Sequence, residues 1–406
     1  MHKYALKRSV AIVIALMMLL VMGLTACGAP ATGDATAPPA TDSTDTPDET
    51  EPATSEEGDI LIGVSTAITG ASPLDGERTR QGVELAVEEI NAKGGVLGRK
   101  LKLVIEDDQN EAAVAVNVAN KLMNEDIVAM LGPQKSGNAA AIQAIAAEKQ
   151  VPFLTGGTSP SLVTFDNDYL FRIRASDQMV AQVAAKFAVE ELDAKNIGIL
   201  YNNDDYGTGG QKVVEAYLTE INVPFVQEGH NTGDKDSTGQ LMKLKNAGVD
   251  AIVLWTHAPE AAVIVRQIQE LGLNVPIVAS PTLTNQDFLN LVDASMVEGH
   301  YSVADFSVDD PREELQDYVK NVKEKYDLVP ELFMTTYYDG VYIIADAIER
   351  AGSTDREAVR QALMETKDLQ GVMGLKSANE LGELVHEATV VTIKDKSPVL
   401  MTVVSE

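Results

Sequence analysis

Short apolar segments alternate with helical segments along most of this chain, and this alternation constrains the fold more than any other feature. Residues 59–67 and 127–131 are apolar runs of the kind found in strands that are buried on both faces. Between such runs, residues 80–93 repeat Val, Ala and Ile at every third or fourth position, which indicates one apolar helix face. The sequence therefore predicts an α/β fold in which parallel sheets carry helices on both faces.

The pattern runs through two successive units and ends in strands. It restarts at residue 169, and strands predicted at 196–202, 251–257 and 276–280 alternate with helices. Two strand-like runs within 388–404 are separated by a polar turn. A length of 406 residues also suggests two domains. We therefore expect two Rossmann-like lobes, and the cleft between two lobes is a frequent place for a small-molecule site.

The segment 127–164 holds the clearest candidate binding loops. It predicts a strand, a loop, a helix over 138–149, a second strand and a second loop. Both loops follow the carboxyl ends of neighbouring strands, where open α/β sheets bind ligands. The first loop carries Ser136 and the second carries Thr158 and Ser159, all beside glycines that let a ligand approach the backbone. The free N–H groups of a following helix favour an anion such as a carboxylate, although the same residue types also serve in ordinary turns and helix caps.

The N-terminal residues predict export and attachment to a membrane. Basic residues precede an uninterrupted apolar run at 10–22, which is shorter than a spanning helix needs and typical of a secretory signal. The sequence LTAC follows at 24–27 and resembles a bacterial lipobox, in which Cys27 is lipid-modified and becomes the mature N-terminus. The alternative is an uncleaved anchor with an incidental cysteine. Because Cys27 is the only cysteine, the mature chain can form no internal disulfide.

Residues 28–58 predict a disordered acidic tether. They contain no Lys or Arg and no apolar residue larger than Ala, and they are rich in Thr, Pro, Asp and Glu. Such a segment cannot bury a core, and its negative charges keep it extended. The whole chain has a formal net charge of −29. This charge argues against nucleic-acid binding, because phosphate recognition needs a basic patch.

The sequence contains no motif for catalysis, metal binding or a cofactor. The glycine-rich run at 95–100 has the wrong spacing for a phosphate loop and precedes a strand rather than a helix. No G-x-S-x-G elbow is present, and the mature chain offers no cysteine nucleophile. Metal-ligand spacing is also missing among the four histidines of the mature chain, His230, His257, His300 and His386. We therefore expect a protein that is not an enzyme and that has no cofactor and no bound metal.

Several stretches together resemble one family. They are ILIGVSTAITG at 60–70, the run 82–108, the run 127–164, YLFRIRASD at 169–177, NIGILYNNDDYGTGG at 196–210 and YYDGVYIIADAIERAGS at 337–353. On these stretches the chain resembles the substrate-binding proteins of branched-chain amino acid ABC transporters, the Leu/Ile/Val-binding type with the type I periplasmic binding fold. The resemblance runs from about residue 59 to the C-terminus.

The resemblance implies an architecture and a function. It implies two lobes joined by three crossings, the first at 59–177 plus 305–380 and the second at 178–304 plus 381–406. It also implies a receptor that closes these lobes on a small polar ligand, an amino acid of the branched-chain type, and delivers it to an ABC permease. Closure works because the ligand contacts both lobes and so favours the closed state. With the N-terminal signal, we expect a monomer that is extracytoplasmic and lipid-anchored to the membrane.

The resemblance further implies roles for residues in the cleft. In the first lobe, Ser136 matches a hydroxyl that contacts the ligand carboxylate. Thr158 matches a position whose backbone carbonyl binds the ligand ammonium, and Ser159 supplies the hydroxyl beside it. In the second lobe, Tyr206 matches an aromatic residue that closes over the ligand, and a further contact comes from His257 or its neighbour.

Two positions depart from the family pattern. Where Leu/Ile/Val-binding proteins place an acidic residue for the ammonium, this chain has Pro281 between Ser280 and Thr282. Where they often place an aromatic residue in the first loop, it has Asp75. Asp75 either replaces the missing carboxylate from the opposite lobe or is a solvated acid of its loop.

Two other functions remain open on the sequence. The same fold would suit a sensor that presents an amino acid, an amide or a small carboxylate to a membrane signalling receptor. A permease gene beside this one would favour transport over sensing. An extracytoplasmic enzyme is the third hypothesis, and it lacks a nucleophile, a metal cluster or paired histidines to carry it.

Overall fold

The computed structural model describes residues 58–164, 168–385 and 387–405. The segment Glu56–Glu406 forms one compact unit. The predicted signal segment, the lipidation site Cys27 and the tether up to residue 57 lie outside the described residues. No helix in the described ranges is long and apolar enough to cross a membrane.

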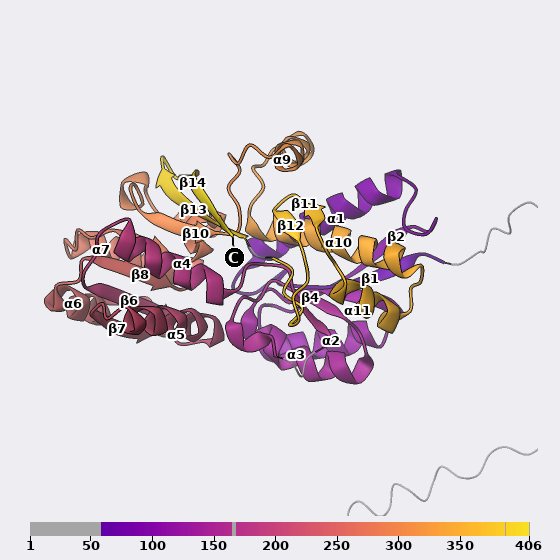
Figure 1. The fold of residues 1–406 in the computed structure, drawn as a ribbon, viewed down its shortest axis with the longest axis horizontal. Coiled ribbons are helices and arrows are strands. Elements are labelled where there is room, and N and C mark those ends of the chain that lie inside the picture. The colour runs from indigo at the N-terminus through magenta and orange to yellow at the C-terminus, as the bar shows by residue number, and fades with distance from the viewer. Residues whose placement is uncertain (1–57, 165–167, 386, 406) are drawn as a thin grey trace, which may run out of the picture. The chain divides into compact units, whose positions relative to one another are not determined.

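A five-stranded parallel sheet organises the first part of the described chain (Figure 1). Its strand order is β2-β1-β3-β4-β5, and all neighbouring strands are parallel. The strands are β1 (Ile60–Thr66), β2 (Leu101–Asp107), β3 (Ile127–Leu131), β4 (Phe153–Thr155) and β5 (Leu170–Arg172). Parallel neighbours need long crossover connections, and helices supply most of them.

Helices cover both faces of this first sheet. On one face lie α1 (Pro73–Ala92), α10 (Leu332–Ala351) and α11 (Arg356–Met364), and on the other lie α2 (Ala112–Met123) and α3 (Ser136–Lys149). Leu131 of β3 is buried against the first group, and its neighbour Met130 against the second. Alternate side chains of a strand point to opposite faces, so an apolar run has to be covered on both.

A second sheet has seven strands in the order β14-β13-β10-β9-β8-β6-β7. They are β6 (Ile197–Asn202), β7 (Phe225–His230), β8 (Ala251–Trp255), β9 (Ile277–Ala279), β10 (Tyr301–Ala304), β13 (Glu387–Lys394) and β14 (Ser397–Ser405). Strands β6 to β10 pair in parallel, whereas β13 is antiparallel to both β10 and β14. The predicted pair of C-terminal strands is therefore present as a hairpin at one edge.

Helices also cover both faces of the second sheet. Helices α4 (Asp177–Glu190) and α5 (Asp205–Glu220) pack on one face, and α6 (Thr238–Ala247), α7 (Ala258–Glu270) and α8 (Gln286–Leu291) on the other. In β8, Trp255 is buried on the first of these faces and Leu254 on the second. The predicted fold class, parallel sheets flanked by helices, is confirmed.

The described chain passes between the two sheets at three places. The first leads from β5 to α4, the second from β10 to α9 (Glu313–Tyr326), and the third from the small hairpin of β11 (Leu369–Gly371) and β12 (Gly374–Lys376) to β13. At the third place the N–H of Leu384 donates to the carbonyl of Arg172 at 2.9 Å. Leu384 is buried in the core beside the first sheet, whereas Val385 belongs to the core beside the second.

Two helices that carry site residues begin earlier than predicted. The helix predicted at 80–93 begins at Pro73, and the helix predicted at 138–149 begins at Ser136. Proline is well suited to the first turn of a helix, because its fixed φ is helical and its missing N–H would be unpaired there. The placement of Asp75 in a loop is therefore wrong, since Asp75 lies in the first turn of α1.

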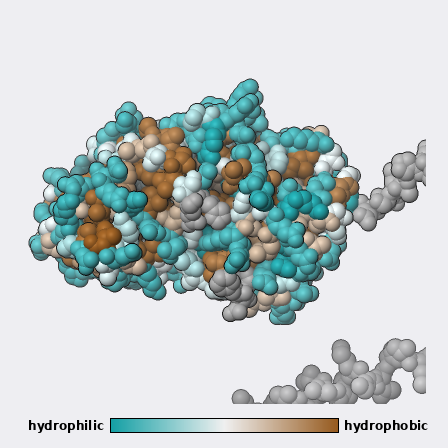
Figure 2. All heavy atoms as spheres, in the orientation of Figure 1, coloured by the Kyte–Doolittle hydropathy of each residue, from teal (hydrophilic) through white to brown (hydrophobic). Residues whose placement is uncertain are grey.

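The surface of the described chain is mainly polar. Figure 2 shows hydrophilic residues over most of one face, with hydrophobic residues in scattered patches. Some of the exposed apolar side chains, such as Met401 and Val403, belong to the edge strand β14. Most of the large apolar residues are instead buried in four clusters, one on each face of each sheet.

Candidate functional site

A cavity of about 720 Å³, including the space at its open mouth, lies where strand ends of the two sheets meet. Residues that line it follow β2, β3, β4 and β5 of the first sheet and β6, β8 and β9 of the second. The carboxyl ends of parallel strands meet at one edge of a sheet, and ligands bind at that edge.

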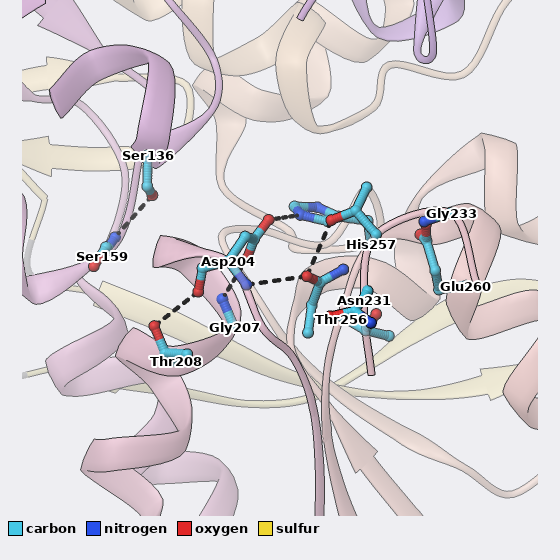
Figure 3. A network of polar contacts seen from close by, with 12 residues as sticks. Ser136, Ser159, Asp204, Gly207, Thr208, Asn231, Gly233, Thr256, His257 and Glu260 are labelled. Carbon is cyan, nitrogen blue, oxygen red and sulfur yellow. Dashed lines mark hydrogen bonds and ion pairs between the residues drawn. The ribbon is translucent and has the colours of Figure 1, made fainter. Parts of the chain in front are cut away.

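Ser136 organises the first-sheet side of the cavity. Its Oγ accepts hydrogen bonds from the backbone N–H of Thr158 at 3.2 Å and of Ser159 at 3.1 Å. Figure 3 shows Ser136 facing Ser159 across the two loops. A hydroxyl has two acceptor lone pairs and one proton, so these contacts leave the Ser136 proton free for donation. This geometry suits a ligand oxygen such as that of a carboxylate.

Two buried arginines hold the carbonyls of the loop after β4. Arg172, which is fully buried, donates from Nη1 to the carbonyl of Thr158 at 2.9 Å and from Nη2 to that of Ser159 at 2.7 Å. It also forms an ion pair with Glu383 at 3.3 Å. Arg174 donates from Nη1 to the carbonyl of Gly156 at 3.1 Å. All three of these carbonyls already accept a hydrogen bond from a cation.

Arg174 also lines the cavity and carries a buried ion pair. Its Nε and Nη2 donate to the two carboxylate oxygens of Asp305 at 3.0 and 2.8 Å. Burial by itself lowers the pKa of Arg174, but the Asp305 carboxylate raises it overall. Two-point contacts of this kind are the strongest that arginine makes with a carboxylate. Arg174 therefore presents a charged guanidinium, held by Asp305, to this wall of the cavity.

On the second-sheet side, Asp204 and His257 form a pair at the cavity wall (Figure 3). The Nε2 of His257 lies 2.6 Å from Oδ2 of Asp204. The other carboxylate oxygen of Asp204, Oδ1, accepts a hydrogen bond from the N–H of Gly207 and so caps the N-terminus of α5. Burial by itself raises the pKa of Asp204, but the His257 and Gly207 contacts lower it overall. The Tyr206 ring stacks on the His257 ring with centroids 5.2 Å apart. Tyr206 and His257 thus form one aromatic wall of fixed orientation.

An acidic corner joins the two sides of the cavity. Asp75 of α1 accepts from Nδ2 of Asn285 at 3.2 Å, and Asn285 caps α8 through its own side chain. Burial and the nearby Asp287 carboxylate raise the pKa of Asp75 to about 7. Because a partly buried carboxylate near a like charge is costly, Asp75 takes up a proton as the pH falls through about 7, far above the range of an exposed carboxyl group.

The raised pKa of Asp75 makes the ligand-free protein less stable as the pH rises. The folded protein binds a proton here that the unfolded chain has lost, so stability falls between about pH 4 and pH 7 and stays lower above that range. We expect Asp75→Asn to raise the free energy of unfolding at pH 8 by about 1–2 kcal/mol, discounted because the side chain is half-buried. Urea unfolding of ligand-free protein measures this gain. Asp395→Asn, an exposed turn residue, is the control, and an equal gain at pH 4 would contradict the assignment.

The structure brings most of the predicted site residues together. Six of them line the one cavity, namely Asp75, Ser136, Thr158, Tyr206, His257 and Pro281. Ser159 does not line it; its hydroxyl lies 3.0 Å from that of Ser161, and its N–H donates to Ser136. Pro281 begins a short 3₁₀ turn, Pro281–Thr284, on the second-sheet side.

Sequence reasoning missed several polar residues of the cavity. Arg174, Asn110 and Gln134 all line it. Each follows a strand of the first sheet, as Ser136 does, so the rule that located Ser136 could also have located them.

In the described ranges no group of three or more His, Cys, Asp or Glu side chains could hold a metal ion.

Comparisons with known proteins agree with this architecture. The model of the periplasmic binding protein family matches residues 59–398. The Leu/Ile/Val-binding protein BraC3 of Rhizobium johnstonii is 29% identical over 339 residues, which are 81% of this chain and 90% of that protein. Both the family and this relative are described as binding proteins, which confirms the prediction that this chain is not an enzyme.

Solved structures show the same fold. The leucine-binding protein LivK of Thermotoga maritima superposes with a TM-score of 0.81 at 27% identity, covering 85% of this chain and 99% of that one. The branched-chain amino acid transporter substrate-binding protein LivJ of Streptococcus pneumoniae, solved with isoleucine, gives a TM-score of 0.79 at 28% identity and covers 86% and 100%. The chain therefore belongs to the periplasmic binding protein family, in the group that includes the Leu/Ile/Val-binding proteins of branched-chain amino acid transporters.

Proposed function

We propose that this protein is the extracytoplasmic receptor of an ABC importer that binds an amino acid of the branched-chain type and delivers it to the permease. The observation that carries the proposal is the cavity where strand ends of two sheets meet. Its walls differ in chemistry. Ser136 offers a hydroxyl proton on one side, and Tyr206 and His257 offer a stacked aromatic surface on the other.

The proposal includes closure of two lobes on the ligand. We assign 59–177 with 305–380 to the first lobe and 178–304 with 381–406 to the second. The hydrogen bond from Asn285 to Asp75 supports contact between the two lobes across the cavity, because it joins α1 of the first lobe to the start of α8 in the second. A ligand that touches both walls stabilises the closed arrangement by its differential affinity.

The proposal also places the protein at the membrane. The basic start, the apolar run at 10–22 and the LTAC sequence support export and lipid attachment at Cys27. The acidic segment 28–58 would then act as the tether between the lipid and the lobes. We expect the receptor to work as a monomer.

A thermal-shift screen of the purified protein, unfolded and refolded to remove carried-over ligand, tests the function. The panel contains the twenty amino acids, short amides, small carboxylates and sugars. A ligand at a hundred times its Kd adds about 2.7 kcal/mol to stability, which raises Tm by several degrees. We expect leucine, isoleucine and valine to give the largest shifts. A response to sugars or amides alone would contradict an amino acid receptor.

A further inference from the structure

The loop after β4 is a poor place for a ligand cation. Its carbonyls at Gly156, Thr158 and Ser159 each accept a hydrogen bond from Arg174 or Arg172. The Arg174 guanidinium, which is paired with Asp305, itself lines the cavity, so an ammonium group placed at the Gly156 carbonyl would compete with the N–H that already donates there. Pro281, on the opposite wall, offers no carboxylate. An ammonium group of the ligand therefore needs acceptors elsewhere in the cavity.

Gln134 supplies one such acceptor. It lines the cavity and is only 5% exposed. Its Nε2 donates to the carbonyl of Asp75 at 3.1 Å and to Oγ1 of Thr79 at 2.7 Å, which sets the orientation of the amide. Its Oε1 has no hydrogen-bond partner among the described residues. A buried acceptor without a partner is unfavourable, so a donor from the ligand would remove this cost on binding.

Asn110 supplies a second acceptor. It also lines the cavity, in the turn that follows β2, and its Oδ1 is buried without a hydrogen-bond partner within the described ranges. Its backbone adopts a left-handed conformation with φ of 61°, and its N–H is held by Oδ1 of Asp108 at 2.9 Å. The backbone conformation therefore sets the position of the Asn110 Cβ atom, whatever contacts the side chain makes.

Asp75 supplies the third acceptor and the negative charge. Its carboxylate lines the same cavity, and its backbone carbonyl is the one that Gln134 contacts. Two nearby carboxyl groups, Asp287 and Glu331, disfavour the ionised form of Asp75. Two nearby basic groups, Lys135 and His257, favour the ionised form. A bound cation would offset the repulsion among the three carboxylates.

We propose that Asp75, Asn110 and Gln134 together bind the primary ammonium group of the ligand. An ammonium has three donors, and the lining of this cavity includes a carboxylate and two amide oxygens that have no partner among the described residues. This inference rests on the proposed function, in which the ligand is an amino acid whose carboxylate lies at Ser136. It specifies the ligand class as amino acids with a free primary ammonium, and it excludes their deaminated and trimethylated analogues.

Titration calorimetry with L-leucine and 4-methylpentanoate, which is leucine without its amino group, tests the proposal on the full chain. We expect the unmodified protein to bind leucine at least 100-fold more tightly than the analogue. Asn110→Gly should weaken leucine binding about tenfold and change analogue binding less than threefold, because glycine keeps the left-handed backbone. Asn110→Asp, which keeps an acceptor, should retain leucine binding.

The control is Asn222→Gly, because Asn222 also has a left-handed backbone, with φ of 56°, but is exposed and does not line the cavity. It should leave both affinities unchanged. Equal losses for leucine and the analogue in Asn110→Gly, or no loss for either, would overturn the ammonium site while leaving the amino acid receptor intact. Absence of leucine binding to the unmodified protein would instead overturn the proposed function and, with it, this inference.

Discussion

Replacement of Arg172 by methionine will lower the free energy of unfolding by about 3–5 kcal/mol, the cost of breaking a buried ion pair from one side. Arg172 is fully buried, and its guanidinium contacts the Glu383 carboxylate and the carbonyls of Thr158 and Ser159. Methionine is long and apolar and fills much of the same space, so lost packing is a minor part of the effect. The two buried carbonyls would each lose a hydrogen-bond donor, and the partly exposed Glu383 would lose its cation.

Urea unfolding of the ligand-free protein measures this change. Arg266→Met is the matched control, because Arg266 lies on the exposed side of α7 and, among the described residues, donates only to the carbonyl of Leu291. We expect the control to change stability by less than about 0.5 kcal/mol. A loss below about 1 kcal/mol in Arg172→Met would mean that this network does not hold the loop and the third crossing together.

Replacement of Ser136 by alanine will weaken ligand binding by about 1–3 kcal/mol, roughly five- to 150-fold in Kd. The hydroxyl orders two backbone N–H groups, those of Thr158 and Ser159, and keeps its own proton for the ligand. Alanine removes this donor and leaves the two N–H groups without their acceptor. The protein should remain folded, because the arginines still hold the loop by its carbonyls.

Calorimetric titration with the amino acid that gives the largest thermal shift measures this loss. Ser159→Ala is the matched control in the neighbouring loop. The Ser159 hydroxyl lies against that of Ser161 and does not line the cavity, so we expect less than a threefold change in Kd. If Ser159→Ala weakened binding as much as Ser136→Ala, the ligand would contact the second loop by its hydroxyl, and the assignment to Ser136 would be wrong.

Much of the fold could be predicted because both sheets leave a clear trace in the sequence. Strands such as β3 and β8 are apolar at every position, since both of their faces are buried. The carboxyl ends of β3 and β4 then indicate where binding loops lie, which is why Ser136 and Thr158 could be named in advance. The start of α1 was missed because the apolar repeat begins only at Val83, whereas the helix begins at Pro73.

The partners of the site residues could not be predicted in the same way. Arg174 meets Asp305, and Arg172 meets Glu383, through segments that are far apart in the sequence. The sequence around Arg172 and Arg174 resembles that around an exposed arginine. It does not reveal which carboxylate each guanidinium will meet once the chain is folded. Ser159 illustrates the same limit, since its hydroxyl looks equivalent to that of Ser136 until the loop is folded.

The sequence by itself determined the α/β architecture, the edge of each sheet where ligand loops lie, and an acidic composition unsuited to nucleic acid. These features follow from local periodicity and from charge, which need no tertiary contact to be seen. Only the tertiary structure decided which loop atoms face the cavity, which carbonyls the arginines occupy, and which acceptors at Asn110 and Gln134 remain unpaired. The physical reason is that hydrogen bonding of a buried group depends on every neighbour it meets, and those neighbours come from distant parts of the chain.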